Sequence, residues 1–195
     1  MTARAPRLAD AVDVDALAVR AAQVDRDAFE VLYQRYLDRI YSYAFYQLGD
    51  HHDAEDVTER VFLAALAALP DFREGPGTFR AWLFRIAHNT IANSLRARAR
   101  HRTIPLPDGF ERPAPETDPA ALVAAAEDRR RVLRAVSSLP EDRRQVILLR
   151  FVDGLSTPEI AEVLDRSAGA VRVLQHRALR DLADRLMPDA VDDRL

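Results

Sequence analysis

Apolar residues return every three or four positions along most of the chain, which is the spacing of one face of an α-helix. The pattern predicts helices over residues 25–49, 53–70, 78–95, 122–139, 141–154 and 156–185. Residues 1–24 carry scattered charges among Ala and Val, so either a short leading helix or a tail fits them. Strand patterns are nearly absent, and we therefore expect an all-α fold.

Local signals separate the first three helices. Gly49 suits the left-handed end of the first helix, and Asp53 and Thr78 are suitable caps for the second and third. The apolar stripes place Tyr33 of the first helix and Phe151 of the 141–154 helix on buried faces. The predicted stripe of the third helix comprises Phe79, Trp82, Leu83, Ile86, Thr90, Ile91 and Leu95.

The strongest local signal begins at Ser156. A Ser with Glu159 three residues later forms a capping box, and Pro158 fits the first turn of the helix that follows. Asp165-Arg166 then makes a tight turn, and Ser167 caps a second helix. This spacing predicts a helix-turn-helix.

The second helix of that motif has a polar face that suits DNA. The residues placed to reach base edges or phosphates are Arg172, Gln175 and His176 for bases, and Arg166, Ser167 and Arg177 for phosphates. The alternative is an ordinary helical hairpin with a solvated polar face.

A proline-rich stretch divides the chain. Residues 103–121 contain five prolines and little periodicity, which favours an extended linker. The predicted organisation is an N-terminal extension 1–24, a helical domain 25–102, the linker 103–121, a helix-turn-helix domain 122–187 and a tail 188–195.

Composition limits the possible partners. A formal charge of -3 argues against general coating of nucleic acid, so DNA contacts must come from local patches. All 28 basic residues are Arg, which suits phosphate and guanine but also fits a GC-rich genome. No cysteine is present, and no apolar run is long enough for a membrane span, so we expect a cytoplasmic protein without membrane insertion.

A second basic region lies on the third helix. Residues 75–107 contain no acid, and their Arg side chains alternate with His and Asn. Phe72, Phe79 and Trp82 add aromatic faces on which an unpaired base could stack, although Trp82 also falls on the apolar stripe and Phe72 also fits a core position. A solvated helix end with favourable dipole interactions is the alternative for the Arg run.

Acidic residues gather at the start of the second helix, over residues 53–59. They complement the helix dipole, which by itself explains them. Helical spacing also places Asp56, Glu59 and Arg60 on one surface that could dock on a basic helix. His51-His52-Asp53 is only a loose metal-like cluster, and the chain lacks a glycine-rich phosphate loop or a paired-carboxylate pocket. We therefore expect no enzyme, no cofactor and no metal.

Together these motifs resemble the bacterial sigma-70 family of RNA polymerase sigma factors, of the extracytoplasmic function (ECF) type. The resemblance covers about residues 26–187. It rests on a series of motifs in fixed order: residues 53–57, 61–63, 79–83, 86–89, 139–141, 148–151, 154–156 and 159–161.

The resemblance implies a sigma-2 helical bundle and a sigma-4 helix-turn-helix domain. Its implied partners are core RNA polymerase, through the β′ clamp helices and the β flap, and promoter DNA, with an anti-sigma factor left open. The residues implied to bind polymerase are Asp53, Glu55, Asp56, Glu59 and Arg60. Those implied to contact the minus-ten element are Phe72, Arg73, Arg80, Arg85, His88, Asn89, Asn93 and Arg96. The minus-thirty-five set is Arg166, Ser167, Arg172, Gln175, His176 and Arg177.

The chain departs from the family pattern at three places. Glu59-Arg60 replaces the usual Gln-Glu after the acidic motif, Asn93 replaces an Asp, and Val173-Leu174-Gln175 replaces Ser-Arg-Leu. The last change bears on the base preference of the recognition helix. Two other classes remain open: a stand-alone helix-turn-helix regulator, which would bind duplex DNA without polymerase, and a helical interaction module without DNA function.

Overall fold

The computed structural model describes residues 14–73, 78–101, 127 and 131–187, and these residues contain helices and turns but no strand. The all-α prediction is confirmed. The helices that come before residue 102 are α1 (Val14–Val24), η1 (Arg26–Ala28), α2 (Phe29–Leu48), α3 (His51–Ala68), η2 (Leu69–Asp71) and α4 (Phe79–His101). Those that come later are α6 (Glu141–Ile147), the π-helical turn η3 (Leu148–Val152), α7 (Thr157–Val163) and α8 (Ala168–Leu186).

The ends of α2, α3 and α4 follow local chemistry. Gly49 ends α2 with φ of 69°, and its amide donates to the carbonyl of Phe45 at 2.8 Å, as predicted. The cap of α3 is Asp50, whose carboxylate accepts from the amide of Asp53 at 3.0 Å, so the prediction of Asp53 as the cap is wrong. Asp50 has the extended backbone that a cap requires, whereas Asp53 already lies in the first turn.

One buried cluster joins α1, α2, α3 and α4. The apolar stripe predicted for the helix at 53–70 is confirmed, since all of its members are buried: Val57, Val61, Phe62, Ala65 and Leu69. Tyr33 was assigned to the core of α2 but is 40% exposed. On α4, Phe84 was missed and is fully buried, whereas Trp82, Ile86, Thr90 and Leu95 are only half-buried.

The second helical unit is built around the helix-turn-helix. Ser156 and Glu159 form both bonds of the predicted capping box of α7. Asp165 takes a left-handed conformation with φ of 51° in the turn, and Ser167 accepts from the amide of Ala170 at 3.1 Å to cap α8. The assignment of Phe151 to a buried face is wrong, because its position in η3 leaves it 59% exposed.

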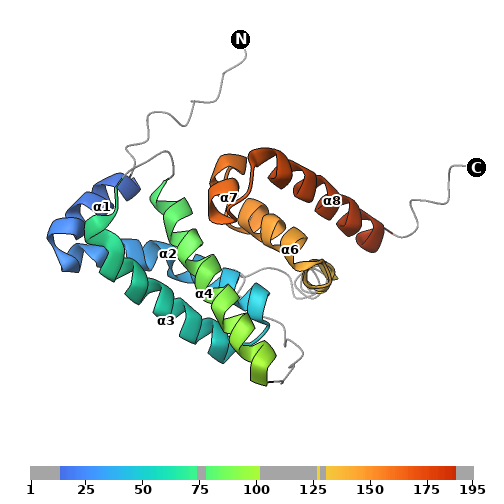
Figure 1. Ribbon diagram of the computed structural model, residues 1–195, viewed down its shortest axis with the longest axis horizontal. Helices are drawn as coiled ribbons and strands as arrows, with labels where there is room; N and C mark the ends of the chain where they lie inside the picture. Colours follow the sequence, from blue (N-terminus) through green and yellow to red (C-terminus); the bar gives the residue numbers. More distant parts are fainter. Residues whose placement is uncertain (1–13, 74–77, 102–126, 128–130, 188–195) are drawn as a thin grey trace, which may run out of the picture.

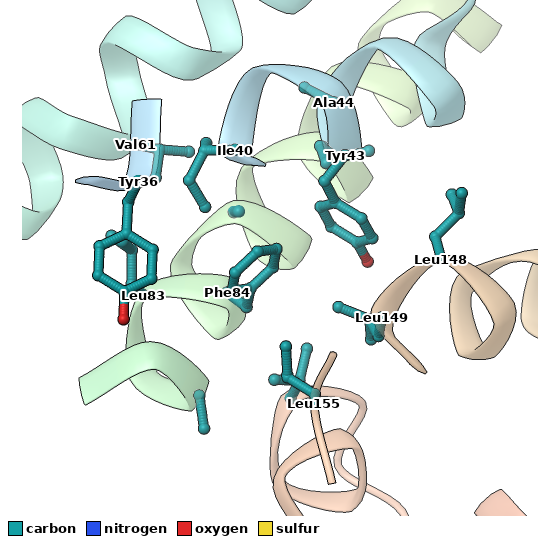
Figure 2. Packing of buried hydrophobic residues seen from close by; sticks show 14 of the residues in the cluster. Tyr36, Ile40, Tyr43, Ala44, Val61, Leu83, Phe84, Leu148, Leu149 and Leu155 are labelled. Atoms are coloured by element: carbon teal, nitrogen blue, oxygen red, sulfur yellow. The ribbon is translucent and has the colours of Figure 1, made fainter. Parts of the chain in front are cut away.

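The two units pack against each other in this structure. The α4 helix contacts α7, and α2 contacts η3 (Figure 1). Tyr43 and Phe84 from the first unit point toward Leu148, Leu149 and Leu155 of the second (Figure 2). All five side chains are buried, so the contact between the units is part of the hydrophobic core.

Several predicted segments lie outside the described residues. They are residues 1–13 of the extension, the linker 103–121, residues 122–126 and 128–130 of the helix predicted at 122–139, and the tail 188–195. The rest of the extension forms α1, and residues 131–137 are helical. Among the described residues, none of the helices is both long and apolar enough to span a membrane.

Candidate nucleic-acid interface

An outward stripe on α4 holds half of the residues assigned to the minus-ten set. Arg85, Asn89, Asn93 and Arg96 are all exposed and follow one another at intervals of four, four and three residues. The opposite face of α4 is buried in the bundle, which fixes the direction of this stripe. The stripe therefore offers two guanidinium groups and two amides on one rigid helix.

The remaining minus-ten residues have other environments. Arg73 is exposed and donates to the carbonyls of Pro70 at 3.0 Å and Phe72 at 3.1 Å. Phe72 itself is only 8% exposed and packs against Phe79 and Trp82, with ring centroids 5.8 and 4.9 Å away. In this arrangement the Phe72 ring packs below the protein surface, and neither of its faces is open to a base.

His88 and Arg80 are engaged within the protein. Nδ1 of His88 lies 3.5 Å from the hydroxyl of Tyr43, and burial lowers the pKa of His88. The Arg80 guanidinium donates to both carboxylate oxygens of Glu159, each at 2.9 Å. These two side chains must leave their present partners before they can contact DNA.

Glu159 connects the helix-turn-helix to α4. Besides capping α7, it accepts a hydrogen bond of 2.6 Å from Thr78, directly before α4. Burial alone would raise the pKa of Glu159, but hydrogen bonds from Thr78, Ser156 and Arg80 outweigh it and lower the pKa to about 2. The carboxylate is therefore charged at neutral pH and ties the two units together.

Asp153 lies at the same junction, at the end of η3. It is 2% exposed, and neither carboxylate oxygen has a hydrogen-bond partner among the described residues. Burial raises its pKa to about 8, even though Arg39 of α2 and Arg80 of α4 act in the opposite direction. A charged Asp153 is therefore unfavourable while the units are packed together.

The polar face of α8 points away from its buried side. Of the apolar residues expected on its inner side, Val171, Leu174 and Ala178 are buried and Leu182 is half-buried. The minus-thirty-five set is largely solvent-facing: Arg166, Ser167, Arg172, His176 and Arg177 are exposed, and Gln175 is half-buried. Because the Ser167 hydroxyl already caps α8, its predicted phosphate contact has to coexist with that bond.

The acidic residues of α3 do not form one uniform patch. Glu55, Asp56, Glu59 and Arg60 are exposed, and Arg60 lies 3.5 Å from Asp56. Asp53 is instead half-buried and forms an ion pair with Arg98 of α4. Asp53 therefore joins α3 to α4, and the other four residues remain accessible to a partner.

An apolar groove beside these acids was missed by sequence reasoning. It lies between α2 and α3 and is lined by Phe29, Tyr33, Leu37, Tyr41, Glu55, Thr58, Glu59, Phe62, Leu63 and Leu66. Leu63 is 59% exposed. The sequence did contain one signal for this groove. Leu63 lies outside the buried stripe of α3, so it is an apolar residue that does not contribute to the core.

Comparisons with known proteins match both helical units. The family model described as Sigma-70 region 2 matches residues 32–101, and that described as Sigma-70, region 4 matches residues 129–182. The ECF RNA polymerase sigma factor BldN of Streptomyces coelicolor is 35% identical over 173 residues, which are 89% of this chain and 65% of BldN. The chain thus spans less than two thirds of the length of that relative.

Two further similarities extend over nearly whole proteins. The ECF RNA polymerase sigma-E factor of Escherichia coli K12 is 35% identical over 180 residues, covering 88% of this chain and 93% of that protein. The solved structure of CnrH in complex with the cytosolic domain of CnrY superposes with a TM-score of 0.68 at 30% identity. That match covers 91% of this chain and all of CnrH.

Proposed function

Because the chain belongs to the ECF RNA polymerase sigma factors of the sigma-70 family, we propose that it binds core RNA polymerase and directs transcription initiation to a subset of promoters. The observation that carries the proposal is the presence, in one chain, of both family regions with a polar stripe exposed on a helix of each. The first unit serves as the sigma-2 domain (residues 25–102) and the second as the sigma-4 domain (residues 122–187).

Polymerase docking uses the α3 surface. Glu55, Asp56, Glu59 and Arg60 supply the polar part, and the groove beside them supplies apolar area. The partner surface would be the β′ clamp helices, with the sigma-4 domain on the β flap. Charges of this kind raise association rate and fix orientation, whereas the apolar groove contributes most of the affinity.

Promoter melting uses the α4 stripe. Arg85 and Arg96 pair with phosphates of the separated strand, while Asn89 and Asn93 donate to and accept from base edges. Arg73 lies beside the segment that would take a flipped non-template base. The chain would open DNA by holding its unpaired form, so binding energy replaces covalent chemistry and no enzymatic step is required.

Recognition of the minus-thirty-five duplex uses α8. Arg172, Gln175 and His176 would enter the major groove, and Arg166 and Arg177 would contact phosphates on either side. Each good base contact contributes roughly 1 to 3 kcal/mol of discrimination. Because Gln175 stands beside Leu174 instead of an Arg, the preferred sequence should differ from that of relatives.

The partners and location follow from this role. CnrH was solved with the cytosolic domain of CnrY. On that ground we include an anti-sigma factor among the proposed partners of this chain. Transcription takes place where polymerase and DNA are, and the proposed location is therefore the cytoplasm.

The experiment that tests the proposal compares DNA binding with and without polymerase. The purified chain is mixed with core enzyme, and complexes are resolved by size and then by gel shift on genomic promoter fragments. We expect a stable complex with core enzyme, and promoter binding that depends on it. Failure to form that complex overturns the proposal, and tight binding to a palindromic duplex by the chain alone would favour the stand-alone regulator.

A further inference from the structure

The helix α1 lies outside both family regions, since the region 2 match begins at residue 32. It is not a loose extension, because Val19 and Ala22 are buried at 2% and 6% exposure. Figure 1 shows α1 at the end of the bundle where α3 ends and α4 begins. The helix α1 contacts both η2, which follows α3, and α4.

Gln23 of α1 holds the chain where it leaves α3. Its side-chain amide donates to the carbonyl of Leu69 at 3.1 Å and to the carbonyl of Phe72 at 2.8 Å. The Leu69 carbonyl also accepts from the amide of Phe72 at 3.1 Å, so Gln23 adds a second, external donor at the end of η2 and ties the path of the chain there to α1. One half-buried amide thus uses both of its hydrogens on η2 and the residue after it.

The same carbonyl connects Gln23 to a residue of the minus-ten set. Phe72 oxygen also accepts from the guanidinium of Arg73 at 3.1 Å. Gln23 and Arg73 therefore meet on a single acceptor, and a shift of that carbonyl moves the Arg73 side chain as well.

A second contact of α1 leads to the start of α4. Asp15 accepts a hydrogen bond from the hydroxyl of Tyr36 and lies 2.9 Å from Nε of Arg35. The ring of Tyr36 meets Phe79, the first residue of α4, edge-on with centroids 5.8 Å apart. Phe79 in turn meets Phe72 at the same centroid distance. Anchors on α1 thus hold the end of η2 with Phe72, and, through Tyr36, the first residue of α4.

We propose that α1 is a positioning element for promoter melting and that Gln23 is its principal positioning residue, holding Arg73 and the end of η2 ready for an unpaired non-template base. The inference rests on the proposed function. Holding a captured base requires that its contacts be ordered before the strands part, because a freely moving segment must lose conformational entropy at that step. Two hydrogen bonds from a packed helix supply this order in advance.

The test uses the full-length chain assembled with core polymerase. Gln23→Met keeps the size of the side chain but removes the donor, and Gln23→Glu also places a carboxylate against two carbonyl oxygens. The matched control is Gln34→Met, since Gln34 donates to Glu30 on the exposed side of α2 at 2.8 Å. Opening is followed as permanganate reactivity of non-template thymines, on a promoter found by mapping the start site of the wild type.

We expect Gln23→Met to slow opening by about tenfold, the effect of roughly one to two lost hydrogen bonds, and Gln23→Glu by at least as much. Gln34→Met should open at the wild-type rate. Polymerase affinity should stay close to wild type for all variants, any loss of thermal stability should be smaller than the opening defect, and a template already unpaired at the minus-ten element should reduce the defect.

Two results overturn the inference while leaving the proposed function intact. One is wild-type opening by both Gln23 variants. The other is slow opening that is accompanied by an equal loss of polymerase affinity or thermal stability, since that pattern marks a purely structural residue. Absence of any start site with wild-type holoenzyme would instead overturn the proposed function, and this inference with it.

Discussion

At the residue scale, Glu159 performs two tasks with one carboxylate. It completes the capping box of α7, and it binds Arg80 and Thr78 of the other unit. Its pKa of about 2 lies below the ordinary value of 4.5, so the charged form is the one that the fold stabilises. The stabilisation is complete above pH 4.5 and is lost as the pH falls toward 2.

Glu159→Gln should lower the free energy of unfolding by about 2 kcal/mol at pH 7, because Arg80 loses a charged partner in a largely buried site. The difference from wild type should shrink as the pH falls from 4.5 toward 2, where the wild-type carboxyl becomes protonated. Urea unfolding at a series of pH values measures both effects. Glu162→Gln on the same helix is the control and should differ little from wild type; a pH-independent difference for Glu159→Gln would contradict the account.

At the scale of elements, α3 combines a buried stripe with an exposed face, which is the proposed docking surface. Leu63 lies on the accessible side and lines the groove next to Glu59. An exposed Leu in a groove is a common anchor for a partner helix.

Leu63→Glu should weaken binding to core polymerase by about tenfold or more, since a charge in an apolar contact opposes desolvation. Val31→Glu is the matched control, because Val31 is also an exposed apolar residue, at 53%, but does not line the groove. Fluorescence anisotropy with labelled chain measures both affinities. Equal polymerase affinities for the two variants would show that the groove is not part of the docking surface.

Local signals predicted the helices better than the site. The end of α2 at Gly49 and the capping box of α7 depend on neighbouring residues, so both were predictable. The cap of α3 was misassigned because Asp50 and Asp53 carry the same side chain, and only the backbone conformation separates them.

The direction of a side chain was predictable where helical periodicity decides it. That Arg85, Asn89, Asn93 and Arg96 lie on one exposed face of α4 follows from their spacing, whereas their contact with DNA stays a prediction. The engagement of Arg80 by Glu159 does not, because 79 residues separate the two in the chain. The contacts of α1 were equally hidden, since the partners of Gln23 are 46 and 49 residues away.

At the scale of the whole molecule, the packed arrangement conflicts with simultaneous reading of both promoter elements. Elements centred near minus ten and minus thirty-five are about 25 base pairs apart, or about 85 Å at about 3.4 Å per pair. A compact chain of this length has a radius of gyration of only about 16 Å. The proposed function therefore requires that the two units separate on the promoter, a change that would also free Arg80.

Two substitutions should shift this separation in opposite directions. Arg80→Ala removes the ion pair with Glu159 and should favour the open form, whereas Asp153→Asn removes a buried charge and should favour the packed form. Because burial raises the pKa of Asp153 from 3.8 to about 8, the wild type should open further as the pH rises from about 4 to about 8 and should change little above that. Asp153→Asn should lose that dependence.

Energy transfer between dyes measures the separation directly. The sequence has no cysteine, so Ala67→Cys on α3 and Ala183→Cys on α8, both at exposed positions, provide two specific labelling sites. Lower transfer is expected for Arg80→Ala and higher transfer for Asp153→Asn at pH 8. Identical transfer in all three proteins would show that neither residue controls the packing of the units.

Run-off transcription with reconstituted holoenzyme tests the central claim most directly. Core polymerase, the purified chain and fragmented genomic DNA are combined, and the 5′ ends of the transcripts are mapped. The account predicts discrete start sites that share sequence near minus ten and minus thirty-five and that disappear when the chain is omitted. Transcripts that start at the same places and in the same amounts with and without the chain would contradict it.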